Sequence, residues 1–100
     1  MGKMLVFTNA LEGRDDEFNR WYDEIHLPEV LALPAFTAAE RLRLAEAQMF
    51  PEQRFRYLAI YEYQGSAADA MDALMGASGS FRMTDTMAAE VQVSLFDGPA

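Results

Sequence analysis

The segment RFRYLAIYEYQ, residues 54–64, constrains the fold more strongly than any other part of the chain. Its bulky side chains recur at every second position, which is typical of a β-strand. One face of this strand carries Phe55, Tyr57, Ala59, Tyr61 and Tyr63. The opposite face carries Leu58 and Ile60, so neither face is suited to contact with water. The sequence therefore predicts a strand that is covered on both sides.

Three further strands are expected from short apolar or alternating runs at residues 3–9, 35–47 and 89–98. In the second of these, Arg41 and Arg43 share one face, opposite Leu42 and Leu44. A helix is expected after three acids that suit a helix N-terminus, Asp15, Asp16 and Glu17. A second helix is expected after Ser66, with an apolar stripe over residues 70–75 and a stop at Gly76.

A proline sets the expected end of the first helix. Leu27 precedes Pro28 and is biased away from helical geometry, so we expect this helix to stop near His26. Pro28 then opens a second short helical turn, PEVLAL, before Pro34 breaks the chain again.

The order β-α-β-β-α-β is the pattern of the ferredoxin-like sandwich, an α+β fold with a four-stranded antiparallel sheet and two helices on one face. We expect the 100 residues to form a single domain. The other face of the sheet would then be uncovered, and we expect the row formed by Tyr57, Tyr61 and Tyr63 to lie there. A second copy packed against that face, in a closed homodimer, would cover it. The alternative is that the tyrosine row lies on an edge strand and does not mark an interface.

Composition excludes several classes of partner. Sixteen acidic against eight basic residues give a net charge of −8, which disfavours nucleic acid and anionic membrane surfaces. The sequence contains no cysteine and no apolar run long enough for a membrane span, so we expect a cytoplasmic protein. Phosphate-binding loops and hydrolase motifs are absent from the sequence as well.

The stretch GRDDEFNRWYDEIHLPEVLALPAF, residues 13–36, together with the order of elements, resembles the dimeric α+β barrel superfamily and its EthD-like small proteins. Ala35 departs from the Gly that many members carry at that point. The resemblance implies a pocket between sheet and helices for small hydrophobic or aromatic compounds. The superfamily includes cofactor-free monooxygenases, isomerases, cyclases and haem-degrading oxygenases, so it leaves the reaction open.

His26 is the leading catalytic candidate, because an imidazole exchanges protons near neutral pH. Tyr22 lies four residues earlier and Asp23 three residues earlier, so Tyr22 is placed to assist it and Asp23 to orient its ring. The alternative is that His26 hydrogen-bonds to free carbonyl groups at the helix end.

Candidate substrate-binding residues are Trp21, Arg41, Tyr57 and Tyr61. Each has a structural alternative: the aromatic rings would pack in the core or at a dimer interface, and Arg41 would pair with an acid. We expect neither a metal nor another cofactor, since His26 is the single histidine and haem would have no second good ligand.

The sequence thus predicts a cofactor-free enzyme, of isomerase, cyclase or monooxygenase type, acting on a small carbonyl or phenolic compound with His26 as acid or base. An EthD-like accessory protein that binds a hydrophobic metabolite is the first alternative. A structural homodimer whose pocket is filled by its own side chains is the second.

Overall fold

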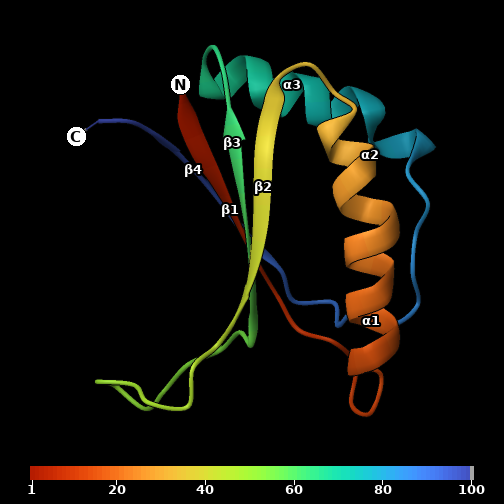
Figure 1. The fold of residues 1–100 in the computed structure, drawn as a ribbon, viewed down its shortest axis with the longest axis vertical. Helices are drawn as coiled ribbons and strands as arrows, with labels where there is room; N and C mark the ends of the chain where they lie inside the picture. The colour runs from red at the N-terminus through yellow and green to blue at the C-terminus, as the bar shows by residue number, and fades with distance from the viewer. Residues whose placement is uncertain (100) are drawn as a thin grey trace.

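Four strands form one antiparallel sheet in the computed structural model, which describes residues 1–99. They are β1 (Gly2–Thr8), β2 (Phe36–Arg43), β3 (Tyr57–Tyr63) and β4 (Gln92–Asp97), and they lie side by side in the order β2-β3-β1-β4. All helices lie on one side of the sheet (Figure 1). The ferredoxin-like α+β sandwich predicted from the sequence is therefore confirmed.

Strands β2 and β3, which form a hairpin, are both shorter than predicted. Residues 44–56, here called the arm, leave the sheet and curl toward the side without helices (Figure 1). A bulge near the start of β2 turns Phe36 to the same face as Ala39 and Arg41, whereas simple alternation placed Phe36 opposite Arg41.

The first helical segment is longer than predicted, because Pro28 does not end it. Helix α1 (Asp15–Trp21) runs into a π-helical turn, η1 (Tyr22–His26), and on into α2 (Leu27–Leu31). In the π turn the backbone N–H of Leu27 donates to the carbonyl of Tyr22, five residues back. This wider turn accommodates the proline, whose missing N–H would break a regular helix. The prediction that the helix stops near His26 is wrong.

Helix α3 (Ala67–Ala77) begins as predicted, with the backbone N–H of Asp69 donating to the Ser66 hydroxyl at 3.1 Å. It ends one residue past Gly76 and continues into a short 3-10 turn, η2 (Ser78–Ser80). Residues 81–91 then form a long loop that leads to β4.

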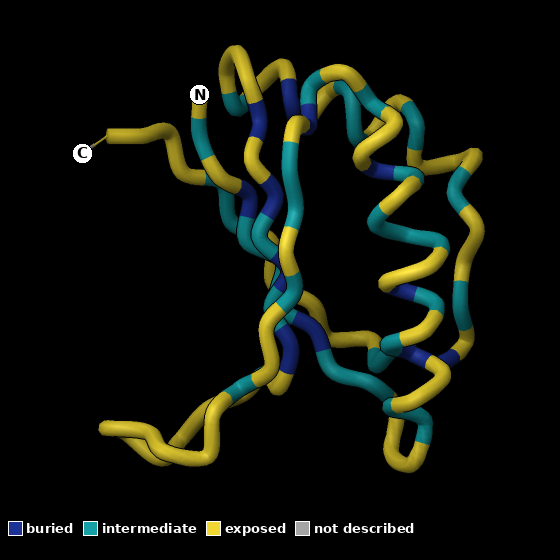
Figure 2. The backbone as a smooth tube through the Cα atoms, in the orientation of Figure 1, coloured by how far each residue is buried: buried dark blue, intermediate teal, exposed yellow. Residues whose placement is uncertain are grey.

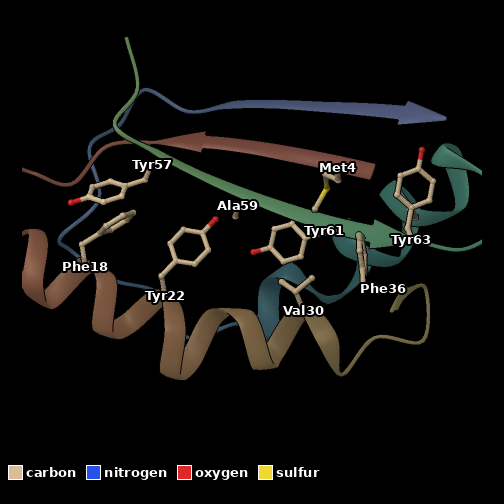
Figure 3. Close-up of a cluster of buried hydrophobic side chains, with 10 residues drawn as sticks. Met4, Phe18, Tyr22, Val30, Phe36, Tyr57, Ala59, Tyr61 and Tyr63 are labelled. Carbon is tan, nitrogen blue, oxygen red and sulfur yellow. The ribbon is translucent and has the colours of Figure 1, made fainter. Parts of the chain in front are cut away.

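The core lies between the sheet and the helices, and it contains the tyrosine row (Figure 3). Tyr57, Tyr61 and Tyr63 are at most 8% exposed and pack against residues of the helical segment and β2, among them Phe18 and Phe36. The prediction that this row lies on the uncovered face of the sheet is wrong. Periodicity separated the two faces of β3 correctly but assigned the wrong one to the helices.

The uncovered side of the sheet, here called the outer face, carries the alternate residues of each strand. Strand pairing places Leu5 beside Ile60 and Phe7 beside Leu58 near its centre. Leu42 and Phe96 flank them and are 47% and 59% exposed. Within residues 1–99 no helix covers this apolar surface, and its backbone is coloured as intermediate or exposed in Figure 2.

Candidate ligand-binding site

An apolar pocket of about 250 Å³ lies between the sheet and the helices. Its floor is the helix-facing side of β1 with Val91 and Val93 at β4, and the helical segment α1-η1-α2 forms one wall. The remaining walls come from Leu74 of α3 and from the 81–91 loop. This is the location that the family resemblance implies.

Three of the polar side chains that line this mainly apolar pocket have a buried atom without a hydrogen-bond partner among residues 1–99. They are Thr8 at its hydroxyl, Tyr61 at its hydroxyl and His26 at Nδ1. Leaving a buried polar group unpaired costs about 1–3 kcal/mol, so native proteins avoid it unless the group has a function. Three such atoms lie around this one pocket.

His26 is held by aromatic rings. Its imidazole stacks on the indole of Trp21, with ring centres 4.8 Å apart, and meets Tyr22 and Phe81 edge to face at 5.1 and 5.7 Å. Burial lowers the pKa of His26, and the nearby Glu29 carboxylate opposes this shift in part. Because the helix continues past His26, the ring does not cap a helix end, and that alternative is wrong.

Tyr22 and Tyr61 point their hydroxyl groups toward one another across the core (Figure 3). Burial raises the pKa of both phenols, so both keep their protons at neutral pH. Although the two groups lie close together, the Tyr61 hydroxyl makes no hydrogen bond of acceptable geometry with any residue in the range 1–99.

Asp23 does not orient His26. Its carboxylate accepts a hydrogen bond from Arg41 at 3.0 Å, and Arg41 also donates to the side chain of Asn19 at 2.9 Å. The guanidinium lies over the Tyr22 ring, 4.3 Å from its centre. The orienting role predicted for Asp23 is thus not present, whereas the alternative for Arg41, pairing with an acid, is confirmed.

Arg41 and Tyr57 lie outside the pocket lining. The Tyr57 hydroxyl donates to Asp15 at 2.6 Å, which attaches the start of α1 to β3. These two predicted substrate-binding residues therefore hold the helix on the sheet, while Trp21 and Tyr61 remain in the pocket wall.

The 81–91 loop is fastened to the helix at one peptide beside His26. The backbone N–H of Arg82 donates to the Glu29 carboxylate at 3.1 Å, and its carbonyl accepts from the Trp21 indole at 3.0 Å. These bonds keep Phe81 and Met83 over the pocket.

Sequence reasoning missed Thr8 and the 81–91 loop. Thr8 ends an apolar strand and looks like an ordinary strand residue, and only its burial, at 1% exposure, reveals it. The loop carries several apolar residues, including Phe81, Met83 and Met87, and this was the available signal that it covers something.

Among residues 1–99, no three His, Cys, Asp or Glu side chains cluster as a metal site would require. In the same part of the chain, no helix combines the length and apolarity needed to cross a membrane.

Solved structures share this fold over nearly the whole chain. A mutant of MhuD, with two manganese protoporphyrin IX groups bound per active site, superposes with a TM-score of 0.68 at 13% identity, covering 98% of this chain and 94% of that one. HapK from Hahella chejuensis gives a TM-score of 0.61 at 15% identity, covering 100% and 96%. An EthD family protein from Bacillus halodurans gives 0.57 at 12% identity, covering 99% and 100%.

The chain shares the fold of these proteins, and the solved structures with this fold include an EthD family protein and an EthD-like protein. The sequence resemblance to EthD-like proteins is thereby confirmed at the level of fold. No protein-family model matches the sequence, and no curated protein matches it significantly. At these identities the likeness does not extend to an activity.

The porphyrin bound to MhuD does not fit the present pocket. A volume of about 250 Å³ lies below the roughly 300–1,000 Å³ of sites that enclose drug-sized ligands, and a porphyrin is larger than most of these.

Proposed function

We propose that this protein is a cofactor-free enzyme that binds a small aromatic or hydrophobic compound bearing a carbonyl or phenolic group and moves a proton on it with His26. The observation that supports this best is the set of three unpaired polar atoms around one apolar pocket. A cavity of about 150 Å³ is enough for benzene. The larger pocket here suits a compound of one or two rings.

His26 acts as the base in this proposal. With its pKa lowered by burial, the ring is neutral at neutral pH and has one nitrogen free to accept a proton. Tyr22 and Tyr61 remain phenols and donate hydrogen bonds to the oxygen on which negative charge develops. Trp21 and the apolar lining exclude water, which strengthens these interactions.

The test combines a ligand screen with one variant. Phenols, quinones and polyketide-like compounds are screened by thermal shift, where a ligand at 100 times its Kd adds about 2.7 kcal/mol of stability. Turnover of each compound that binds is then compared between the wild type and His26→Gln. We expect His26→Gln to remain folded and to lose turnover, and an unchanged rate would remove His26 from the mechanism.

A non-catalytic protein that binds a hydrophobic metabolite is the second candidate. It is favoured by the position of Asp23, because its pairing with Arg41 leaves the His26 ring without the carboxylate that usually orients a catalytic histidine. Ligands that bind tightly and are recovered unchanged by mass spectrometry would support this candidate over the enzyme.

We also propose that two copies of the chain pack through the outer face. Leu5, Phe7, Leu58 and Ile60 form a continuous apolar surface at its centre, of a kind that monomers seldom leave in water. The arm curls toward the same side of the sheet and carries Met49 and Phe50, which are 88% and 71% exposed. A two-fold dimer would cover both features.

A further inference from the structure

Two hydroxyl groups in the pocket, those of Thr8 and Tyr61, have no evident structural use. Their residues are 1% and 0% exposed, so bulk water does not reach them, and neither hydroxyl makes a hydrogen bond of acceptable geometry within residues 1–99. Both residues come from the central strands β1 and β3, which are the most firmly held part of the sheet. Their positions are therefore fixed before a ligand arrives.

No Arg or Lys side chain of residues 1–99 lines the same pocket. Arg41 lies behind the Tyr22 ring, outside the lining, where it is bonded to Asp23 and Asn19 and has an unpaired Nε. Arg82 also lies outside the lining, and its backbone is bonded to Trp21 and Glu29. The charge nearest His26 is the Glu29 carboxylate, and the chain as a whole carries a net charge of −8.

An anionic ligand is disfavoured by this arrangement. Burying a carboxylate without a cation costs several kcal/mol, and neither hydroxyl groups nor a neutral imidazole supply the missing charge. An uncharged oxygen, by contrast, matches the unpaired groups: it accepts from a hydroxyl and, when it is itself a hydroxyl, also donates.

We propose that Thr8 and Tyr61 are ligand-binding residues, and that they and His26 make the pocket selective for an uncharged compound bearing a hydroxyl or carbonyl group over a carboxylate of the same shape. This inference rests on the proposed use of the pocket as a ligand site, but not on catalysis. The three residues line the pocket while their unpaired atoms are buried, so a ligand reaches these atoms only when neighbouring side chains move.

Three probes of one shape test the selectivity: naphthol, naphthalene and naphthoate, each titrated calorimetrically near neutral pH. We expect naphthol to bind about 10-fold more tightly than naphthalene, because it pairs with groups that are otherwise unsatisfied. We expect naphthoate to bind at least about 100-fold more weakly than naphthol. Naphthoate binding as tightly as naphthol would overturn the proposal.

Substitutions assign the preference to the two residues. Thr8→Val and Tyr61→Phe should each weaken naphthol binding by about 3- to 10-fold and leave naphthalene binding unchanged. The matched control is Tyr63→Phe, which removes a buried tyrosine hydroxyl from the same strand but outside the pocket, and it should leave both affinities unchanged. Unaltered naphthol affinity in both test variants would contradict the assignment.

The outcomes also separate this inference from the proposed function. Selective naphthol binding that depends on Thr8 and Tyr61, in a protein without any turnover, would support the inference and remove the catalytic role of His26. Turnover that depends on His26, without a preference for uncharged ligands, would support the catalytic role of His26 and overturn the inference. If none of the three probes binds, the pocket is not a site for ligands of this size, and the inference fails.

Discussion

The imidazole of His26 lies nearly flat on the indole of Trp21, with ring centres 4.8 Å apart and planes 18° from parallel. Packing therefore orients the ring, where many catalytic histidines are oriented by a carboxylate. The indole N–H is in turn bound to the carbonyl of Arg82, so the loop, the indole and the imidazole form one stacked unit. A histidine held in this way has no hydrogen-bond partner for Nδ1 among residues 1–99.

The burial of His26 predicts a dependence of stability on pH. The pKa of His26 is lower in the folded protein than its ordinary value of about 6.5. At a pH between these two pKa values, the unfolded chain therefore binds more protons than the folded chain. Stability is then fully present above about 6.5 and falls as the pH drops through this window, by up to about 1.4 kcal/mol per pH unit. Urea unfolding at a series of pH values measures this fall in the free energy of unfolding.

His26→Gln is the control for that experiment, because His26 is the single histidine of the chain. The variant should lose the part of the slope that lies between the two pKa values. An identical slope in the variant would show that His26 does not titrate as its burial predicts.

Two tyrosines of β3 should respond in opposite ways when their hydroxyls are removed. The hydroxyl of Tyr63 donates to Asp97 at 2.6 Å, so Tyr63→Phe should lower the free energy of unfolding by about 1–2 kcal/mol. The hydroxyl of Tyr61 has no partner, so Tyr61→Phe should leave stability unchanged or raise it. Chemical denaturation of both variants gives the comparison, and a larger loss for Tyr61→Phe would mean that its hydroxyl is paired in the free protein.

Gly2 is required where the start of β1 packs closely between β3 and β4. A Cβ at this position would overlap the Tyr63 hydroxyl and the Phe96 carbonyl, so Gly2→Ala should destabilise the protein by about 1–3 kcal/mol. Gly76→Ala is the matched control, because the added methyl group meets open space within helix α3 and should stabilise by about 0.5–1 kcal/mol. Thermal unfolding of the two variants should therefore shift in opposite directions.

The proposed dimer is tested on the outer face by Ile60→Lys. In a single chain the new ammonium group would lie beside Glu40, its neighbour across β2 and β3, and should be tolerated. In a face-to-face dimer the same charge would be buried, at a cost of several kcal/mol. Sedimentation at micromolar concentration should give a dimer for the wild type and a monomer for Ile60→Lys.

Met75→Lys, on the exposed side of α3, is the control and should remain dimeric. A wild-type protein that sediments as a monomer at this concentration would refute the dimer.

The order of elements was predictable because each strand and helix carries its own local pattern. The face of the sheet that meets the helices was not predictable, since β3 is apolar on both sides and only packing decides between them. Tyr61 is buried and Ile60 lies on the outer face, although either residue suits a core. Periodicity divides a strand into two sets of residues without stating what covers each set.

The site was predicted in part. Trp21, Tyr22, His26 and Tyr61 do line one pocket between the sheet and the helices, although the predicted faces of the sheet had placed Tyr61 on the uncovered side. The prediction failed at two points, where the surrounding structure overrode a rule based on neighbouring residues in the sequence. A π turn carried the helix past Pro28, and long-range pairing took Asp23 to Arg41, a partner eighteen residues away.

The nitrogen resonances of His26 test the central claim most directly, since a single histidine gives a single set of imidazole signals. The account predicts that naphthol, added to the ¹⁵N-labelled protein near neutral pH, shifts the Nδ1 resonance in proportion to binding, and that naphthoate does not. Naphthol binding, seen by calorimetry, that leaves the His26 resonances unmoved would place the ligand elsewhere and contradict the account.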